Sequence, residues 1–444
     1  MFENKLSADD LVAKLLCISK TEPVYILDSC GVGHLGSHLL IAALRPVEIV
    51  DASHANPEET LRILDDKLSQ NMAAIFTLSY DFGAKLQPVS VGTKEASRTE
   101  ADAFIALFNF LIIHDYDSGS TRVVGNDRES CDAVELIGTQ SPDVESFEMA
   151  AGQTAPVTSN FTRPEYIAAV ERIREHIRNG DTYQTNLTQQ LRCQLSPDTT
   201  PEALYWRLRR DHPAPFSAFL KRPHSTVVSA SPERFFRVAR NRDIEASPIK
   251  GTSRRGKSVE EDMRLRSELL SSAKDRAENT MIVDLVRNDI GRVCEFGSVV
   301  VEKLCDIEEH PTLFHLVSTV RGKLRDGITF SKILRAVFPC GSITGTPKIR
   351  TMQLIDEIEN SSRGLSMGAI GFYFPERWDL GDSTLNAVFD LSVAIRTMVV
   401  RDGEAVFNVG GGVVIDSDPE KEFDESMLKA QSLLNAIGAP SVAK

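Results

Sequence analysis

The sequence has no excess of positive charge and no long apolar run, and each absence excludes a class of function. Its 50 lysines and arginines face 63 acidic residues, and the net charge of −13 argues against nucleic-acid binding, which needs a basic surface. No stretch approaches the roughly 20 apolar residues that a membrane span requires. Residues 1–16 combine early acids with only a short apolar run, so we expect no signal peptide.

Features of disulfide-stabilised proteins are also missing. The seven cysteines are scattered, odd in number and include no Cys-x-x-Cys pair, a pattern typical of a reducing compartment. With 42% hydrophobic and 25% charged residues, the composition is that of an ordinary globular protein. We therefore expect a cytoplasmic protein that binds neither membrane nor nucleic acid.

Internal repeats and the strand–helix alternation of parallel sheets are absent as well. Short apolar runs such as 73–80 and 226–230 predict strands, so the expected class is α+β with large antiparallel sheets. Residues 138–160 lose hydrophobic periodicity and gain Ser, Thr, Pro and Gly, which predicts a linker. We expect an N-terminal α+β subdomain over residues 1–150 and a second domain over 160–440.

One predicted strand, residues 182–193, carries polar side chains along a whole face. Alternation places its apolar residues on one side of the strand. The other side carries Gln184, Asn186, Thr188 and Gln190. A polar strand face most often meets solvent, and otherwise it lines a polar ligand cleft. Both alternatives stay open at this point.

Two predicted helices carry acids three residues apart. Asp275 and Glu278 share a face of a helix expected at 273–289, and Glu422 and Glu425 share a face of the last helix. Acid pairs on helices are usually solvated. If these two helices face each other, four carboxylates converge, and a cation is needed to offset their repulsion. Oxygen ligands with several waters suit Mg²⁺.

Basic residues and glycines indicate a site for an anion. Lys250 precedes Gly251, and glycine lets the backbone come close to a ligand. A lysine becomes a nucleophile when its pKa falls from about 10.4. The apolar run 391–400 predicts one strand, and Arg396 interrupts it, which suggests a carboxylate partner for its guanidinium. The triplet Gly410–Gly412 offers backbone N–H groups to an anion, although such a triplet also occurs in simple turns.

Several ordered motifs together resemble the family of chorismate-utilising enzymes, which includes anthranilate, aminodeoxychorismate, isochorismate and salicylate synthases. The resemblance covers roughly 160–437, and ILDSC at 26–30 is similar to the family's N-terminal domain. It implies an active site in a central cleft between sheets flanked by helices. The motifs are PIKGT (248–252), AENTMIVDLVRNDIGRVC (277–294), FHLVSTV (314–320), GSITGTPKIRTMQLIDEIE (341–359), GAIGF (368–372), AIRT (394–397) and GGGVVIDSDPEKEFDES (410–426).

Within the family, Lys250 favours aminodeoxychorismate synthase component I, because anthranilate synthases carry alanine there. The resemblance implies an aminotransferase that makes 4-amino-4-deoxychorismate, on the route to p-aminobenzoate and folate, through a covalent bond from Lys250 to C2 of chorismate. Glu233, in the segment SPERF, would be the general acid. Gln184 stands where isochorismate-type members carry a water-activating lysine, and a neutral amide argues against water as nucleophile. The alternatives are an anthranilate synthase component I and a non-catalytic regulatory homologue.

The resemblance also implies ligands and partners. Glu278 and Glu425 would bind Mg²⁺, supported by Asp275 and Glu422. A glutamine amidotransferase subunit would supply ammonia, and the ILDSC segment would mark a site for tryptophan or another amino acid. Phe372 in place of a usual tyrosine, Thr346 in place of alanine and a long segment at 375–390 depart from the family pattern. The expected substrate-binding residues are Gln184, His315, Thr344, Lys348, Arg396, Gly411 and Gly412.

Overall fold

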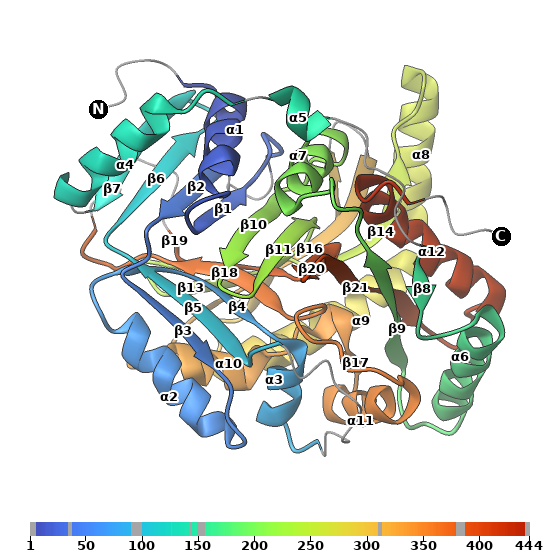
Figure 1. Ribbon diagram of the computed structural model, residues 1–444. Helices are drawn as coiled ribbons and strands as arrows, with labels where there is room; N and C mark the ends of the chain where they lie inside the picture. The colour runs from blue at the N-terminus through green and yellow to red at the C-terminus, as the bar shows by residue number, and fades with distance from the viewer. Residues whose placement is uncertain are drawn as a thin grey trace.

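Two antiparallel sheets form the centre of the molecule, and helices cover their outer faces (Figure 1). The computed structural model describes residues 6–33, 38–89, 100–125, 127–142, 144–148, 156–309, 313–378 and 387–439. Within these residues, the first sheet has eleven strands and the second has ten. The expected α+β class with large antiparallel sheets and flanking helices is confirmed.

The first sheet runs in the order β17-β9-β21-β20-β11-β10-β1-β2-β6-β7, with β8 paired to β9. Its strands are β1 Val24–Asp28, β2 Leu39–Leu44, β6 Phe110–Asp115, β7 Ser120–Gly125, β8 Thr158–Ser159, β9 Gln184–Gln194, β10 Phe216–Arg222, β11 Ser225–Ser231, β17 Gly345–Thr346, β20 Thr397–Arg401 and β21 Glu404–Val413.

The second sheet runs in the order β14-β16-β13-β12-β19-β18-β4-β5-β3, with β15 paired to β16. Its strands are β3 Glu48–Ala52, β4 Ala73–Leu78, β5 Ala103–Phe108, β12 Arg234–Ala239, β13 Asp243–Ala246, β14 Ile249–Arg254, β15 Val300–Glu309, β16 Leu313–Lys323, β18 Ala369–Tyr373 and β19 Ala387–Val393.

Helices close both outer faces. Leucines of α1, α7 and α12 pack in one core with the first sheet, and apolar residues of α2, α9 and α10 pack in another with the second sheet. The helices are α1 Ala8–Ile18, α2 Pro57–Leu68, α3 Tyr80–Leu86, α4 Asp127–Thr139, α5 Val144–Glu148, α6 Arg163–Arg178, α7 Pro201–Asp211, α8 Val259–Ser271, α9 Ala273–Gly291, α10 Phe330–Val337, α11 Lys348–Ile358 and α12 Pro419–Ala436, with a 3₁₀ turn η1 at Gly341–Ile343.

A third core fills the space between the sheets, and β5 shows how alternation builds it. Ile105 and Leu107 face α2 on the outside, whereas Phe104 and Phe108 point inward, where they meet Tyr25 of β1. Because successive side chains of a strand point to opposite faces, one apolar strand serves two cores. This explains why strands such as β2, β4 and β5 are buried along their whole length.

Both sheets cross the boundary that the sequence predicts near residues 150–160. Strand β1 pairs with β10 in the first sheet, and β4 pairs with β18 in the second. Residues 1–150 and 160–440 therefore share both sheets and the interior between them. Of the predicted linker, residues 143 and 149–155 lie outside the described residues. Among the described helices, none is long and apolar enough to cross a membrane.

Candidate active site

A cavity of about 650 Å³ lies where strands of both sheets meet the facing ends of α9 and α12. Strands β9 and β21 of the first sheet and β14 and β16 of the second contribute side chains to its wall. Most residues that the sequence singled out line this cavity, although they come from distant parts of the chain. They are Glu233, Lys250, Asp275, Glu278, His315, Arg396, Gly411, Gly412, Glu422 and Glu425.

Lys250 reaches the cavity from β14, next to the first turn of α9. Gly251 adopts a φ of +88°, a region that side-chain-bearing residues rarely occupy. A Cβ at Gly251 would lie 3.0 Å from Cδ1 of Leu269 and 3.1 Å from Cβ and Cγ of Asp275, so a side chain there would require these neighbours to shift by a few tenths of an ångström. The glycine beside Lys250 therefore allows the strand and the acid-bearing helix to approach each other closely.

Glu233 is a buried carboxyl group in the wall of the same cavity. It follows β11, where the chain passes from the first sheet to the second, and its backbone carbonyl accepts a hydrogen bond from Val393 N–H at 3.0 Å. Burial raises the pKa of Glu233, and the positive charge of Lys250 offsets part of that rise. Burial thus favours the protonated form, which is the form a general acid needs.

The four acids line the cavity together, which is the arrangement expected if the two helices face each other. Two lysines lie among them: Lys274 Nζ is 3.9 Å from Oε1 of Glu278, and Lys429 Nζ is 2.8 Å from Oε1 of Glu425. Lys429 also donates to the backbone carbonyl of Gly410 at 3.1 Å. Sequence reasoning missed both lysines, although each stands four residues from its acid, a spacing that places the pair on one helix face.

The donor set suits a hard cation, but the side chains of Glu278, Glu422 and Glu425 are engaged with protein groups. Burial raises the pKa of Glu278 and of Glu422, and Ser417 donates to Oε1 of Glu422 at 2.6 Å. Burial acts against ionisation of Glu425 too, but the Lys429 ammonium outweighs it and holds the pKa of that carboxyl below its usual value. Among the described residues, no three His, Cys, Asp or Glu side chains form a ready-made metal cluster. Carboxylate-rich sites that complete their shell with water remain compatible with Mg²⁺.

Arg396 is held in an unusual backbone conformation at the cavity wall. The run 391–400 was predicted as one strand, and that prediction is wrong: β19 ends at Val393 in the second sheet, and β20 begins at Thr397 in the first. Arg396 lies in the crossing with a φ of +47°, and its carbonyl accepts from Ala230 N–H at 3.0 Å. Non-glycine residues at positive φ are strained, and such strain concentrates at functional sites.

The environment of the Arg396 side chain indicates a site for an anionic ligand. Burial lowers the pKa of its guanidinium, and within the described part of the chain no ion pair to a carboxylate is present. Arg396 is only partly exposed, and a guanidinium that loses hydration without gaining a counter-ion is costly. A ligand carboxylate would supply the missing partner through two parallel hydrogen bonds.

Backbone amides of β21 face the cavity beside Arg396. Strand β20 pairs with β21 only up to Val406, so beyond it the described strands pair with β21 on the β9 side alone. Alternate N–H groups of the segment 407–413 therefore point away from β9. A Cβ at Gly411 would lie 3.3 Å from Oε2 of Glu422, so the glycine keeps backbone and acid close.

The polar face of β9 is buried, so the solvent alternative for that face is wrong. Gln184, Thr188 and Gln190 are at most 4% exposed. Within the described residues, both amide atoms of Gln184 and Nδ2 of Asn186 have no hydrogen-bond partner. Buried polar atoms are nearly always paired in folded proteins, which favours the ligand-cleft alternative. Asn186 lines the cavity, and Gln184 packs against Gly412 behind it.

Besides Gln184, two further predicted substrate ligands, Thr344 and Lys348, are not among the residues that line the cavity. The Lys348 ammonium is buried, where it pairs with Asp289 and donates to the carbonyl of Val337 at 2.9 Å. Thr344 donates to the carbonyl of Cys340 at 3.0 Å. Both side chains thus support the loop and helix behind the wall, and their predicted contact with substrate stays a prediction.

The departures from the family pattern lie mostly away from the cavity. Phe372 packs between the sheets against Phe374, with ring centroids 4.8 Å apart, while Tyr373 points to the other face, because successive side chains of a strand alternate. Of the long segment at 375–390, residues 379–386 lie outside the described residues. His315, on β16, is buried in the cavity wall.

The ILDSC segment forms a polar cluster in the first sheet. Asp28 accepts from Arg209 at 2.7 Å, from the Tyr116 hydroxyl at 2.7 Å and from the Cys30 amide at 2.8 Å. Its carboxylate thus uses both oxygens on groups of the protein. The amino-acid site expected in this region stays a prediction.

Known proteins share this fold and much of this sequence. Residues 23–435 match the family model described as chorismate binding enzyme, and the chain belongs to this family. The chain is 36% identical over 373 residues to aminodeoxychorismate synthase component 1 of Bacillus subtilis (strain 168), which covers 82% of this chain and 76% of that protein. It is also 36% identical over 383 residues to anthranilate synthase component 1 of Aquifex aeolicus (strain VF5), covering 81% of this chain and 73% of that one.

A solved structure confirms the architecture. The crystal structure of anthranilate synthase component I from Streptococcus pneumoniae TIGR4 matches with a TM-score of 0.76 and 27% identity, over 90% of this chain and 93% of that chain. Larger relatives named aminodeoxychorismate synthase exist as well, and this chain spans between 29% and 41% of their length. The chain is therefore similar to proteins of both names. The residues that line the cavity have to decide which of the two activities is proposed for this chain.

Proposed function

We propose that this protein is the chorismate-aminating component of an aminodeoxychorismate synthase, which converts chorismate and ammonia to 4-amino-4-deoxychorismate and water. The observation that carries the proposal is that Lys250 and the buried Glu233 line one cavity together with Arg396. This set provides a nucleophile, a proton donor and a carboxylate ligand. The product is the precursor of p-aminobenzoate in folate biosynthesis, and the enzyme is an aminotransferase.

In the proposed mechanism, Nζ of Lys250 forms a bond to C2 of chorismate while the C4 hydroxyl leaves. Glu233 donates the proton with which that hydroxyl departs as water. Ammonia then forms the bond to C4, and the electron pair that moves through the ring expels Nζ from C2 as a neutral amine. The new C4 ammonium gives one proton back to the Glu233 carboxylate. The net change replaces one hydroxyl by one amino group and releases one water, so atoms and charge balance. Arg396 and the β21 amides hold the substrate carboxylates during both steps.

The direct test is product analysis. Purified protein with chorismate, Mg²⁺ and an ammonium salt is expected to give 4-amino-4-deoxychorismate, identified by chromatography and by its conversion to p-aminobenzoate on addition of a lyase. Boiled protein and a reaction without ammonium serve as controls. Anthranilate together with pyruvate would contradict the assignment of Lys250, and complete absence of turnover would favour the regulatory homologue.

An anthranilate synthase is the second candidate, and the observation in its favour is the equal identity to the Aquifex aeolicus protein. That activity needs no covalent lysine. A lysine at position 250 beside a buried acid would then lack a purpose, which is why we rank this candidate lower.

We also propose a Mg²⁺ site at the four acids, with Glu278 and Glu425 as direct ligands and Asp275 and Glu422 as close or water-mediated supports. The cation would neutralise the carboxylates and hold a substrate carboxylate. Binding requires Glu425 to exchange Lys429 for the metal, because the two groups are paired at 2.8 Å.

Removal of divalent cations is expected to abolish turnover, because the uncompensated acids would then face the substrate carboxylate. Dialysis against EDTA followed by addition of Mg²⁺ tests this, and calorimetric titration of Mg²⁺ into the protein provides a readout independent of activity. A Glu278→Gln variant should lose the calorimetric signal. The exposed Glu268→Gln on α8 is the control that should keep it. Full turnover in EDTA would overturn the metal proposal.

The proposed source of the ammonia is a second protein component. The relatives named component 1 imply a second component, and a glutamine amidotransferase subunit would release ammonia for this chain. Free ammonium salt replaces that subunit in the assay described above.

A further inference from the structure

Ser342 is a residue of the active-site cavity to which the proposed mechanism gives no part. It lies in the 3₁₀ turn η1 and lines the cavity together with Glu233. Both residues are buried, with 5% and 6% of their surface exposed. Because burial removes their side chains from bulk water, their polar atoms depend on partners in the protein or on a ligand.

The Ser342 hydroxyl has two neighbours that compete for its proton. Its Oγ lies 3.3 Å from Sγ of Cys340, which is 7% exposed. Burial raises the pKa of Glu233, and the positive charge of Lys250, the Ser342 hydroxyl and the backbone N–H of Ile249 each oppose that rise. Oε1 of Glu233 has no hydrogen-bond partner among the described residues. A hydroxyl carries one proton, so it cannot donate to the sulfur and to the carboxyl group at the same time.

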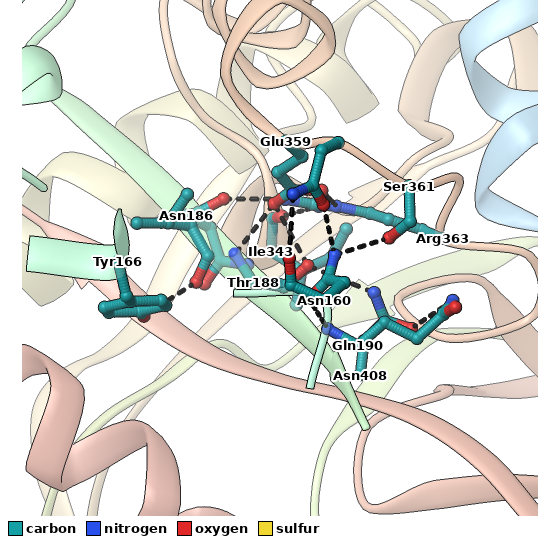
Figure 2. A network of polar contacts seen from close by, with 12 residues as sticks. Asn160, Tyr166, Asn186, Thr188, Gln190, Ile343, Glu359, Ser361, Arg363 and Asn408 are labelled. Atoms are coloured by element: carbon teal, nitrogen blue, oxygen red, sulfur yellow. Dashed lines mark hydrogen bonds and ion pairs between the residues drawn. The ribbon is translucent and has the colours of Figure 1, made fainter. Parts of the chain in front are cut away.

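The backbone of the turn is fixed, so the hydroxyl is the part that can rotate. Figure 2 shows Arg363 donating to the carbonyl of Ile343 at 2.9 Å and to the carbonyl of Asn186 at 2.6 Å. A Cβ at Gly341 would lie 2.6 Å from Cδ2 of Leu285, so the glycine lets the turn pack directly on α9. A serine hydroxyl rotates about one bond, and its proton therefore changes partner without any movement of this frame.

We propose that Ser342 is a positioning residue whose hydroxyl turns from Cys340 to Glu233 when Glu233 gives its proton to the departing C4 hydroxyl. This inference rests on the proposed function. Before the transfer Glu233 is neutral, and Ser342 donates to Sγ of Cys340. After the transfer a carboxylate is left in buried surroundings, where a hydrogen bond to its charge is stronger than one to a thiol. Ser342 keeps its own proton throughout, and the proton that leaves comes from Glu233.

Other titratable groups also line the cavity with Glu233. Lys250 of β14 carries the charge that acts on it, and His315 of β16 and Arg396 lie in the same wall, as do the acids and lysines of α9 and α12. Burial, and after it the charge of Glu233, raises the pKa of the Cys340 thiol to about 12, so the thiol is neutral near pH 7. Variants at Ser342 and Cys340 therefore leave the charges around Glu233 unchanged.

The test measures the pKa of Glu233 by infrared titration of the carboxyl band that disappears in Glu233→Gln. In Ser342→Ala this pKa is expected to rise by about one unit, because a donor to the charged form is lost. The rate of adduct formation on Lys250, followed without ammonia by quenching and mass spectrometry, should fall about tenfold, while the calorimetric Kd for chorismate stays unchanged. Ser342→Thr, which keeps a hydroxyl, should restore both values.

Cys340→Ala is expected to shift the pKa of Glu233 in the opposite direction, downward, because the hydroxyl then has no sulfur to which it can donate. In a Ser342→Ala background the same substitution should have no further effect, since the two residues act through one proton. The matched control is Ser331→Ala on α10, a buried serine that donates to the carbonyl of Leu61 and does not line the cavity. It should leave the pKa of Glu233 and the adduct rate unchanged.

The outcomes separate this inference from the proposed function. An unchanged pKa of Glu233 in Ser342→Ala overturns the inference, and so does a failure of Ser342→Thr to restore it. A chorismate Kd that rises as much as the rate falls also overturns it, because the hydroxyl would then bind substrate. If Ser342→Ala fails to fold, Cys340→Ala decides, and an unchanged pKa there is the contrary result. The infrared titration uses free protein, so wild-type protein that aminates no chorismate refutes the function while the titration still reports the contact of Ser342 with Glu233.

Discussion

Replacing Lys250 with alanine is expected to lower the rate of chorismate amination by on the order of 10³-fold or more, because the covalent bond to C2 can then not form. The fold should be unaffected, since Lys250 is only partly buried on a strand and forms none of the ion pairs found in the described residues. Single-turnover assays with ammonium salt measure the loss. Chorismate binding, followed by calorimetry, should change far less than the rate.

The matched control is Lys257→Ala, which removes a lysine from an exposed loop a few residues further along the chain. It should keep full activity. Mass spectrometry adds a readout that a structural effect cannot imitate: wild-type protein quenched during turnover without ammonia should carry a covalent adduct on Lys250. Near-normal amination by Lys250→Ala would remove the covalent mechanism and leave ammonia as the only nucleophile.

The buried pair Glu359–Arg363 is expected to dominate the local stability of the site. Arg363 donates to the carbonyls of Ile343 and Asn186, both next to the cavity, and its guanidinium lies 4.4 Å from the ring centre of Tyr80. Arg363→Met should lower the free energy of unfolding by about 3–5 kcal/mol, because it leaves the carboxylate of Glu359 buried without its counter-charge. Urea denaturation measures this change.

The control is another Arg–Glu pair at i, i+4 spacing, Arg264–Glu268 on α8, whose side chains are 58% and 57% exposed. Arg264→Met should cost no more than about 0.5 kcal/mol, since solvent screens exposed pairs. The double variant Glu359→Leu with Arg363→Met should recover part of the loss, because it removes both buried charges. Equal effects of the exposed and buried single substitutions would show that burial does not set the strength of this pair.

Patterns within one element could be predicted from the sequence, whereas relations between elements could not. The helix periodicity places Asp275 with Glu278 and Glu422 with Glu425, and α9 and α12 carry these pairs as expected. The alternation of polar and apolar residues along β9 is equally visible in the sequence. The burial of that polar face could not be predicted, because it depends on contacts of Thr188 with Glu359 and Asn408, which lie 171 and 220 residues further along the chain.

The position of Arg396 likewise depends on a relation between elements that the sequence pattern does not reveal. Its apolar neighbours on both sides predict a continuous strand, since periodicity carries no information about a change of sheet. The crossing is set by the pairing of β19 with β12 and of β20 with β11, which are contacts distant in sequence. The lysines at 274 and 429 were in principle readable from their spacing to the acids. Their presence at the cavity became visible only when both helices were placed against it.

The pairing of β4 with β18 also has a consequence for biosynthesis. Among the described strands, the N-terminal strands β3, β4 and β5 join the rest of the second sheet through β18 at Ala369–Tyr373 alone. On a ribosome that adds roughly 5–20 residues per second, the apolar edge of β4 stays unpaired for on the order of tens of seconds until β18 is synthesised. During that time it offers unpaired backbone groups to other nascent chains. Protection by a chaperone that covers sheet edges would therefore matter more for this chain than for one whose sheets close locally.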